Sequence, residues 1–193
     1  MNYLFIYFDS PSNDKIINKF KKLKCNVTDI YFKDIKQDNL KELTICDALI
    51  LGPDRPINLT TLNDLPKKLD IVANLYNLYK NKKVLGICFG CQLLGVLNKC
   101  VVDKLDTPLL KVKIKTNLSK KYKISKNIKK DIFQYNNKRA IVKPHKNVSV
   151  LAKNEHGIMG IKIKGKKHYG LQFHPEQSGL QGFEIFENFV NLK

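Results

Sequence analysis

One cysteine in this chain stands in a sequence that is typical of an activated nucleophile. Cys88 lies between Gly86 and Gly90, directly after an apolar run at residues 84–87 and directly before a helix-like stretch. This order predicts a sharp strand-to-helix turn that lifts the thiol above a sheet, with glycines where a Cβ would collide with backbone. Free N–H groups and the dipole of the following helix favour a thiolate over a thiol. We therefore predict that Cys88 is a nucleophile rather than a small buried apolar residue.

A base and an acid follow another strand-like segment far downstream. His174 and Glu176 come directly after residues 170–173 and are separated by a single proline. In a catalytic triad, the base takes the proton of the nucleophile, and a third group orients and stabilises the imidazole. The three residue types, each at the end of a predicted strand, indicate a Cys-His-Glu triad. The other histidines of the chain lack such a context.

The segments around Cys88 and His174 resemble the two signature motifs of class I glutamine amidotransferases, in the same order along the chain. The resemblance implies a glutaminase that hydrolyses the side-chain amide of L-glutamine and passes the ammonia to a separate synthase partner. Cys88 would form a γ-glutamyl thioester and His174 would be the general base and acid. Glu176 would orient His174, and no cofactor or metal is expected.

Oxyanion donors follow from the same resemblance. The backbone N–H of Phe89, directly after the nucleophile, is one candidate. The other is assigned to Gly52, because residues 52–56 resemble the Gly-Pro-Gly-x-Pro oxyanion loop of the family. Here Asp54 stands where a second glycine is usual. Aspartate tolerates left-handed backbone better than most residues, but its charge would oppose an oxyanion, so we expect an intact fold and reduced activity.

Substrate contacts are also assigned by resemblance. Gln92 matches the family glutamine that helps to hold the substrate amino acid; otherwise it would be a polar residue on the exposed start of a helix. His145 stands where relatives carry a short histidine-containing segment whose following residues grip the substrate through backbone groups. Cys91 is expected to pack rather than react. The predicted substrate-binding residues are Gly52, Asp54, Gln92, Lys146 and Asn147.

The length and the cysteine content limit the number of domains and the cellular compartments that are compatible with the sequence. A chain of 193 residues, 43% of them hydrophobic, fits one domain that spans residues 1–193. Its five cysteines are odd in number and irregularly spaced, which indicates reduced thiols in the cytoplasm or a reducing organelle compartment. Cys88 and Cys91 form a C-x-x-C without a second pair at zinc spacing. No signal peptide is expected, and no stretch approaches the ~20 apolar residues of a membrane span.

The chain carries a formal net charge of +18. Such an excess is found in proteins that bind nucleic acid or anionic membranes. The most basic part, residues 104–146, contains few aromatic residues and no nucleic-acid-binding motif. We therefore expect neither a nucleic acid nor a membrane as partner.

The elements that must position these residues alternate between strand and helix through the first half of the chain. This alternation predicts a doubly wound, mostly parallel, flavodoxin-like α/β sheet with ligands at the carboxyl ends of its strands. Short alternating strands at residues 101–115 and 140–173 predict a small antiparallel region, and a lysine-rich surface excursion separates them at 117–130. Predicted strands are 2–8, 26–31, 47–51 and 84–87; predicted helices are 13–24 with a Ser12 cap, 69–81, 89–97 and 182–192.

The sequence is compatible with more than one synthase as the user of the ammonia. The run after His174 is most like the glutaminase subunit of imidazole glycerol phosphate synthase, whereas residues 52–56 are closer to the anthranilate, aminodeoxychorismate or GMP synthase types. The synthase would belong to amino-acid, cofactor or nucleotide biosynthesis. Two alternatives of other classes are a stand-alone γ-glutamyl hydrolase and a catalytically weak binding or regulatory module on the same fold.

Overall fold

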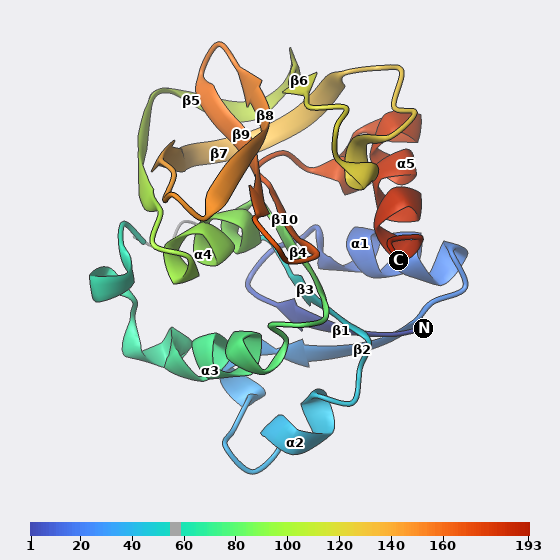
Figure 1. The fold of residues 1–193 in the computed structure, drawn as a ribbon, viewed down its shortest axis with the longest axis vertical. Helices are drawn as coiled ribbons and strands as arrows, with labels where there is room; N and C mark the ends of the chain where they lie inside the picture. Colours follow the sequence, from blue (N-terminus) through green and yellow to red (C-terminus); the bar gives the residue numbers. More distant parts are fainter. Residues whose placement is uncertain (55–58) are drawn as a thin grey trace.

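The computed structural model describes residues 1–54 and 59–193, whose strands form one mixed sheet (Figure 1). Five strands run parallel, each paired with the next in the order given at the end of this paragraph. The predicted parallel, doubly wound core is therefore confirmed. These strands are β2 (Asn26–Tyr31), β1 (Asn2–Tyr7), β3 (Ala48–Leu51), β4 (Lys83–Ile87) and β10 (His168–Leu171).

Alternation along the strands separates two apolar cores, one on each face of the sheet. Tyr3 and Phe5 of β1 belong to the cluster that contains buried side chains of α1 (Asn13–Lys22) and α5 (Gly179–Val190). Leu4, between them, belongs to the opposite cluster, which holds side chains of α3 (Asp70–Leu78), α4 (Phe89–Leu97) and α2 (Leu40–Leu43). Successive side chains of a strand point to opposite faces, so helices on both sides are needed to bury a continuous apolar strand.

The predicted helices are present, with some differences at their ends, and the short helix α2 is an element that the sequence did not predict. The helix predicted at 89–97 matches α4, while α1 and α3 end earlier than predicted and α5 begins earlier. Ser12 precedes α1, but its side chain makes no capping hydrogen bond. Its hydroxyl instead accepts a hydrogen bond from Nε2 of Gln177 at 2.9 Å, so the predicted Ser12 cap is wrong.

The second half of the sheet is antiparallel and contains longer strands than predicted. β9 (Gly157–Ile163) pairs with β10, β7 and β8, while β7 pairs with the edge strand β5 across two long, irregular segments. In Figure 1 this half stands above the parallel strands. The other bounds are β5 (Val101–Lys115), β6 (Asn117–Leu118), β7 (Ile132–Lys143) and β8 (Val148–Asn154).

Residues 117–130 are only partly the solvated excursion that their lysines indicate. Ile124 and Ile128 are buried in the core cluster that includes α5. The side chain of Asn188, on α5, donates to the carbonyl oxygens of Ile124 and Lys126. Scattered apolar residues therefore hold this segment against the helix while its lysines remain solvated.

The topology brings together two segments that are far apart in sequence. β4 and β10 are adjacent and parallel, and their register pairs Ile87 with Leu171. The residues that follow these two positions therefore emerge at the same carboxyl edge of the sheet. No helix in the described part of the chain is long and apolar enough to cross a membrane.

Candidate active site

Cys88 occupies a strained turn between β4 and α4. Its backbone has φ 53° and ψ −107°, a left-handed conformation that costs a non-glycine residue about 1–3 kcal/mol. The turn needs glycine at two positions because neighbouring backbone is very close. A Cβ on Gly90 would lie 2.0 Å from the carbonyl oxygen of Leu51, and a Cβ on Gly86 would lie 2.3 Å from the carbonyl oxygen of Gly90. The structure thus has the predicted strand-to-helix geometry, with the thiol at the N-terminus of α4.

His174 and Glu176 form a tight buried pair directly after β10. Nδ1 of His174 lies 2.7 Å from Oε1 of Glu176, and the side chains are 5% and 0% exposed. Pro175 begins a 3₁₀ turn, Pro175–Gln177, that directs the carboxylate back to the imidazole. The backbone N–H of His174 donates to the carbonyl of Gln134 at 2.8 Å, so β7 also holds the histidine in place.

Three influences compete to set the charge of His174. Burial acts to lower its pKa, but the nearby Cys88 sulfur and the Glu176 carboxylate outweigh burial and raise the pKa to about 10. Nε2 of His174 has no hydrogen-bond partner among the described residues and therefore remains available for the thiol. The pair is suited to keep the imidazole protonated beside the Cys88 sulfur.

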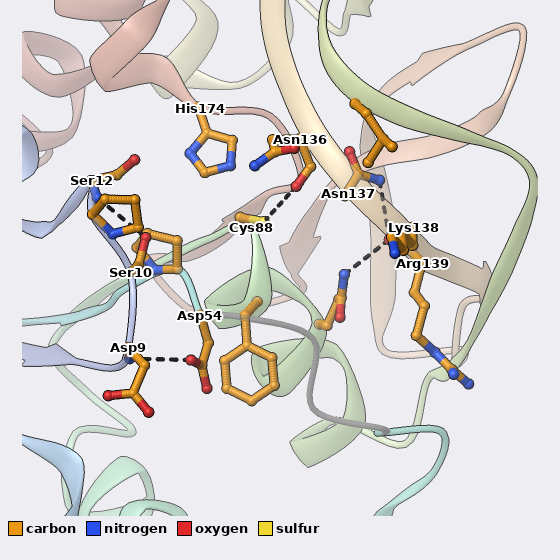
Figure 2. A pocket seen from close by; sticks show the side chains of 15 residues that line it. Asp9, Ser10, Ser12, Asp54, Cys88, Asn136, Asn137, Lys138, Arg139 and His174 are labelled. Carbon is orange, nitrogen blue, oxygen red and sulfur yellow. Dashed lines mark hydrogen bonds between the residues drawn. The ribbon is translucent and has the colours of Figure 1, made fainter.

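These groups face a cavity of about 270 Å³ (Figure 2). Figure 2 shows Cys88 and His174 together, with Asp9 and Asp54 toward one end and Lys138 and Arg139 toward the other. Sγ of Cys88 lies 3.9 Å from the carbonyl oxygen of Asn136 on β7. The lining residues are Asp9, Ser10, Pro11, Ser12, Pro53, Asp54, Cys88, Phe89, Gln92, Leu110, Asn136, Asn137, Lys138, Arg139 and His174.

The two predicted oxyanion donors differ in their availability. The N–H of Phe89 donates to no described residue and lies at the start of α4, beside the thiol. The N–H of Gly52, in contrast, donates to the carbonyl oxygen of Ile6 at 3.0 Å and so extends the ladder between β1 and β3. The next residue, Pro53, has no N–H. Gly52 therefore offers no donor to an oxyanion in this conformation.

Asp54 lies in the cavity wall, but its carboxylate is engaged. Oδ1 accepts the backbone N–H of Asp9 at 3.1 Å, which connects the loop after β3 to the loop after β1 (Figure 2). The figure shows the carboxylate directed toward Asp9 rather than toward the Cys88 sulfur. The last two residues of the predicted loop, 55 and 56, lie outside the described part of the chain.

The structure brings only some of the predicted substrate contacts to the cavity. Gln92 lines it, whereas Lys146 and Asn147 are exposed in the turn between β7 and β8 and do not. Lys146 is nine residues beyond Asn137 along the chain, roughly 30 Å of extended strand. The wall beside Cys88 is instead the segment 136–139 of β7, which no motif in the sequence marks because its residues form an ordinary polar stretch of a strand.

The sheet carries a cysteine on a strand-to-helix turn and a buried His-Glu pair beside it, at the carboxyl ends of two neighbouring parallel strands. The family model described as "Glutamine amidotransferase class-I" matches residues 4–192, and the chain belongs to that family.

Several relatives are more specific in name. The imidazole glycerol phosphate synthase subunit HisH of Pelagibacter ubique is 24% identical, and the match covers all of both chains. The protein of the same name from Buchnera aphidicola is 30% identical over 69% of this chain and 75% of its own. Among solved structures, a Thermoplasma acidophilum protein named as part of a GMP synthase has a TM-score of 0.83 at 20% identity, covering 98% and 92% of the chains.

Proposed function

We propose that this chain is a glutaminase that hydrolyses the side-chain amide of L-glutamine and supplies the ammonia to a separate synthase subunit. The observation that carries the proposal is the position of Cys88 and His174 in one cavity, with the imidazole held by Glu176 at 2.7 Å. The HisH relatives support a partner of the imidazole glycerol phosphate synthase type.

The reaction follows from the charges of these groups. The Cys88 thiolate attacks the amide carbon of glutamine, and the N–H of Phe89 stabilises the oxyanion of the tetrahedral intermediate. His174, which holds a proton because its pKa is raised, donates that proton to the departing nitrogen. Ammonia leaves and a γ-glutamyl thioester remains on Cys88. His174 then takes a proton from water, which attacks the thioester and releases glutamate and the thiolate.

Replacement of the nucleophile tests this proposal. The wild-type chain should release ammonia from L-glutamine, and Cys88→Ala should abolish the release while the thermal unfolding midpoint stays close to that of the wild type. A glutamine-analogue alkylator should label Cys88 and spare Cys25, Cys46 and Cys100. Labelling centred on Cys91 would show that the other thiol is the nucleophile.

Addition of a synthase separates the proposed role from its alternatives. Glutamine turnover should rise when a synthase of the imidazole glycerol phosphate type is added, and a synthase of the GMP type is the matched control. Full turnover that no synthase changes would instead indicate a stand-alone γ-glutamyl hydrolase. No turnover and no labelling under any condition would indicate a binding module.

A further inference from the structure

The Glu176 carboxylate has two hydrogen-bond donors, and both contact the same oxygen. Oε1 of Glu176 lies 2.7 Å from Nδ1 of His174 and 3.2 Å from Nε2 of Gln177. Oε2 of Glu176 is buried and has no hydrogen-bond partner among the described residues. The carboxylate is therefore oriented through one oxygen, and Gln177 supplies the second of the two contacts that hold it.

Gln177 also contacts the loop that follows β1. Its Nε2 lies 2.9 Å from Oγ of Ser12, in addition to its contact with Oε1 of Glu176. An ionised carboxylate only accepts hydrogen bonds, so the carboxamide must present its NH₂ group to Glu176, which removes the usual ambiguity between amide nitrogen and oxygen. The two N–H bonds of that group can serve both partners at once. Gln177 therefore bridges the triad acid and the loop.

The loop at the other end of this bridge is itself well anchored. The N–H of Ser12 donates to Oγ of Ser10 at 3.3 Å, and the carbonyl oxygen of Ser12 accepts the N–H of Ile16 at 3.2 Å. Nδ2 of Asn13 donates to the carbonyl oxygen of Phe8 at 2.7 Å. Ser12 is buried. The bridge thus connects the carboxylate to a fixed point outside the turn that carries it.

The second donor is uncharged although positive charges are close by. Glu176 and Gln177 line an outer groove together with lysines of α1. Among the described residues, however, no ion pair joins Glu176 to a lysine. A cation bonded to Oε1 would compete with the His174 imidazole for the negative charge, whereas a neutral carboxamide orients the carboxylate and leaves that charge to the imidazole.

We infer that Gln177 is a positioning residue, which holds the Glu176 carboxylate toward the His174 imidazole by tying Oε1 to Ser12. This inference rests on the proposed function, because the pair it concerns is the acid and base of that reaction. Gln177 is not among the residues that line the catalytic cavity. Its effect on the reaction must therefore pass through the residues to which it is bonded.

The expected effect of the bridge follows from the freedom of a carboxylate. The last torsion of a glutamate side chain is broad, so a carboxylate with a single donor can rotate around it. Without Gln177, His174 would be the one remaining donor to Oε1 among the described residues. The distance between Nδ1 of His174 and the carboxylate should then lengthen on average, and the imidazole should lose part of its orientation.

A direct test is the proton magnetic resonance of the His174 Nδ1–H, recorded on the full chain with isotope-labelled histidine. Gln177→Met keeps the length of the side chain and removes the donor. The resonance should move upfield, because a longer hydrogen bond deshields its proton less. A downfield move would mean that Gln177 only weakens the carboxylate as an acceptor, and it would overturn the positioning role, as would an unchanged resonance.

Turnover gives a second readout. With the synthase present, Gln177→Met should lower kcat for glutamine hydrolysis by about three- to tenfold, the range for one hydrogen bond, and leave KM unchanged. Gln181→Met is the matched control, because Gln181 is a carboxamide on α5 that bonds the carbonyl oxygen of Ile132 and not the triad. The control should change neither the resonance nor kcat.

A double-mutant cycle shows whether Gln177 acts through Glu176. In a Glu176→Ala chain, Gln177→Met should cause no further loss of kcat, because the group that it positions is gone. The same loss as in the wild-type background would overturn the inference.

A variant at the other end of the bridge keeps the test decisive if Gln177→Met does not fold. Ser12→Ala removes the anchor and should also move the His174 resonance upfield; an unchanged resonance would overturn the bridge. The resonance does not require turnover. A wild-type chain that shows the expected resonance shifts but no glutamine turnover would therefore count against the proposed function and not against the bridge.

Discussion

The imidazole of His174 is held in a state that burial by itself would oppose. Burial lowers its pKa, and the Cys88 sulfur and Glu176 carboxylate reverse that effect and raise it to about 10. His174 therefore carries at neutral pH the proton that the proposed reaction requires. Because two separate groups supply this stabilisation, removal of one should have a smaller effect than removal of the imidazole.

Substitutions in the His-Glu pair test this ranking. We expect His174→Asn to reduce glutamine turnover by about 10²-fold or more, because it removes general acid–base catalysis. Glu176→Gln should cost less and should also shift the alkaline limb of the pH–rate profile to lower pH, because the carboxylate no longer raises the pKa of His174. Turnover and its pH profile are measured in the presence of the synthase. A larger loss for Glu176→Gln than for His174→Asn would contradict the assigned roles.

We expect Asp54 to lower the rate of glutamine hydrolysis by the isolated chain. Its carboxylate connects the loop after β3 to the N–H of Asp9, while the N–H of Gly52 is bound to Ile6. Loss of one oxyanion donor costs ~10²–10³ in rate, so unassisted thioester formation should be slow by about that factor. Asp54→Gly removes the connection and the charge and should raise glutamine hydrolysis by the isolated chain.

Asp54→Asn separates the two effects of this residue. The asparagine keeps an acceptor for Asp9 but lacks the negative charge, so a rise only in the glycine variant assigns the restraint to the hydrogen bond. A rise in both assigns it to the charge. Normal turnover by the wild-type chain, unchanged in either variant, would show that Asp54 has no restraining role.

At the scale of elements, the contact between the elbow and β3 sets the position of the thiol. Gly90→Ala would place a methyl group 2.0 Å from the Leu51 carbonyl oxygen, where backbone must move. We expect a loss of roughly 2–4 kcal/mol in the free energy of unfolding, measured by denaturant titration. Gly95→Ala, on the same helix, meets the side chain of Ile141 rather than backbone and should cost less than Gly90→Ala. Equal costs would contradict a special role for the elbow contact.

Elements whose signal is local could be predicted from the sequence. The elbow is encoded within a few residues around Cys88 and the His-Glu pair within the segment that begins at His174, so both could be located without knowledge of the fold. The parallel core could be predicted because a strand covered on both faces is apolar throughout.

Features that depend on pairing between distant strands could not be predicted. The N–H of Gly52 donates to the carbonyl oxygen of Ile6, on a different strand, and no local sequence pattern predicts that hydrogen bond. The cavity wall is another case, because the long pairing of β7 with β5 decides which polar residues reach Cys88. The prediction of Lys146 and Asn147 as substrate contacts rests on the neighbouring His145, but β7 places them in a turn outside the cavity that Cys88 lines.

At the scale of the whole molecule, His168 makes the free energy of unfolding depend on pH. It is 0% exposed, and its Nδ1 lies 3.1 Å from the hydroxyl of Tyr76, which accepts a hydrogen bond from Asn98 at 2.8 Å. The ring and the hydroxyl therefore lie within hydrogen-bond distance in a buried network that also includes Asn98. Burial, with a further contribution from Lys166, lowers the pKa of His168 to about 4.

The free energy of unfolding falls at low pH because the pKa of His168 is lower in the folded chain than in the unfolded chain. The unfolded chain has a histidine pKa near 6.5 and binds the proton first, so the stability from a neutral His168 is present above about pH 6.5 and is lost as pH falls to about 4. The loss amounts to about 3 kcal/mol. His168→Gln should flatten the dependence of the unfolding free energy on pH in this range, and His156→Gln should leave it as in the wild type. An unchanged slope in His168→Gln would contradict this assignment.

The ladder between β4 and β10 has a consequence for how such a protein can diversify. The nucleophile and the base follow neighbouring strands in one parallel register, whereas the wall at 136–139 belongs to the antiparallel part inserted between them in sequence. Residues 136–139 of the cavity wall therefore belong to a segment separate from those that carry Cys88 and His174. Insertions, deletions and exchanges within residues 101–163 can remodel this part of the cavity wall, while Cys88 and His174 stay in register at the ends of β4 and β10.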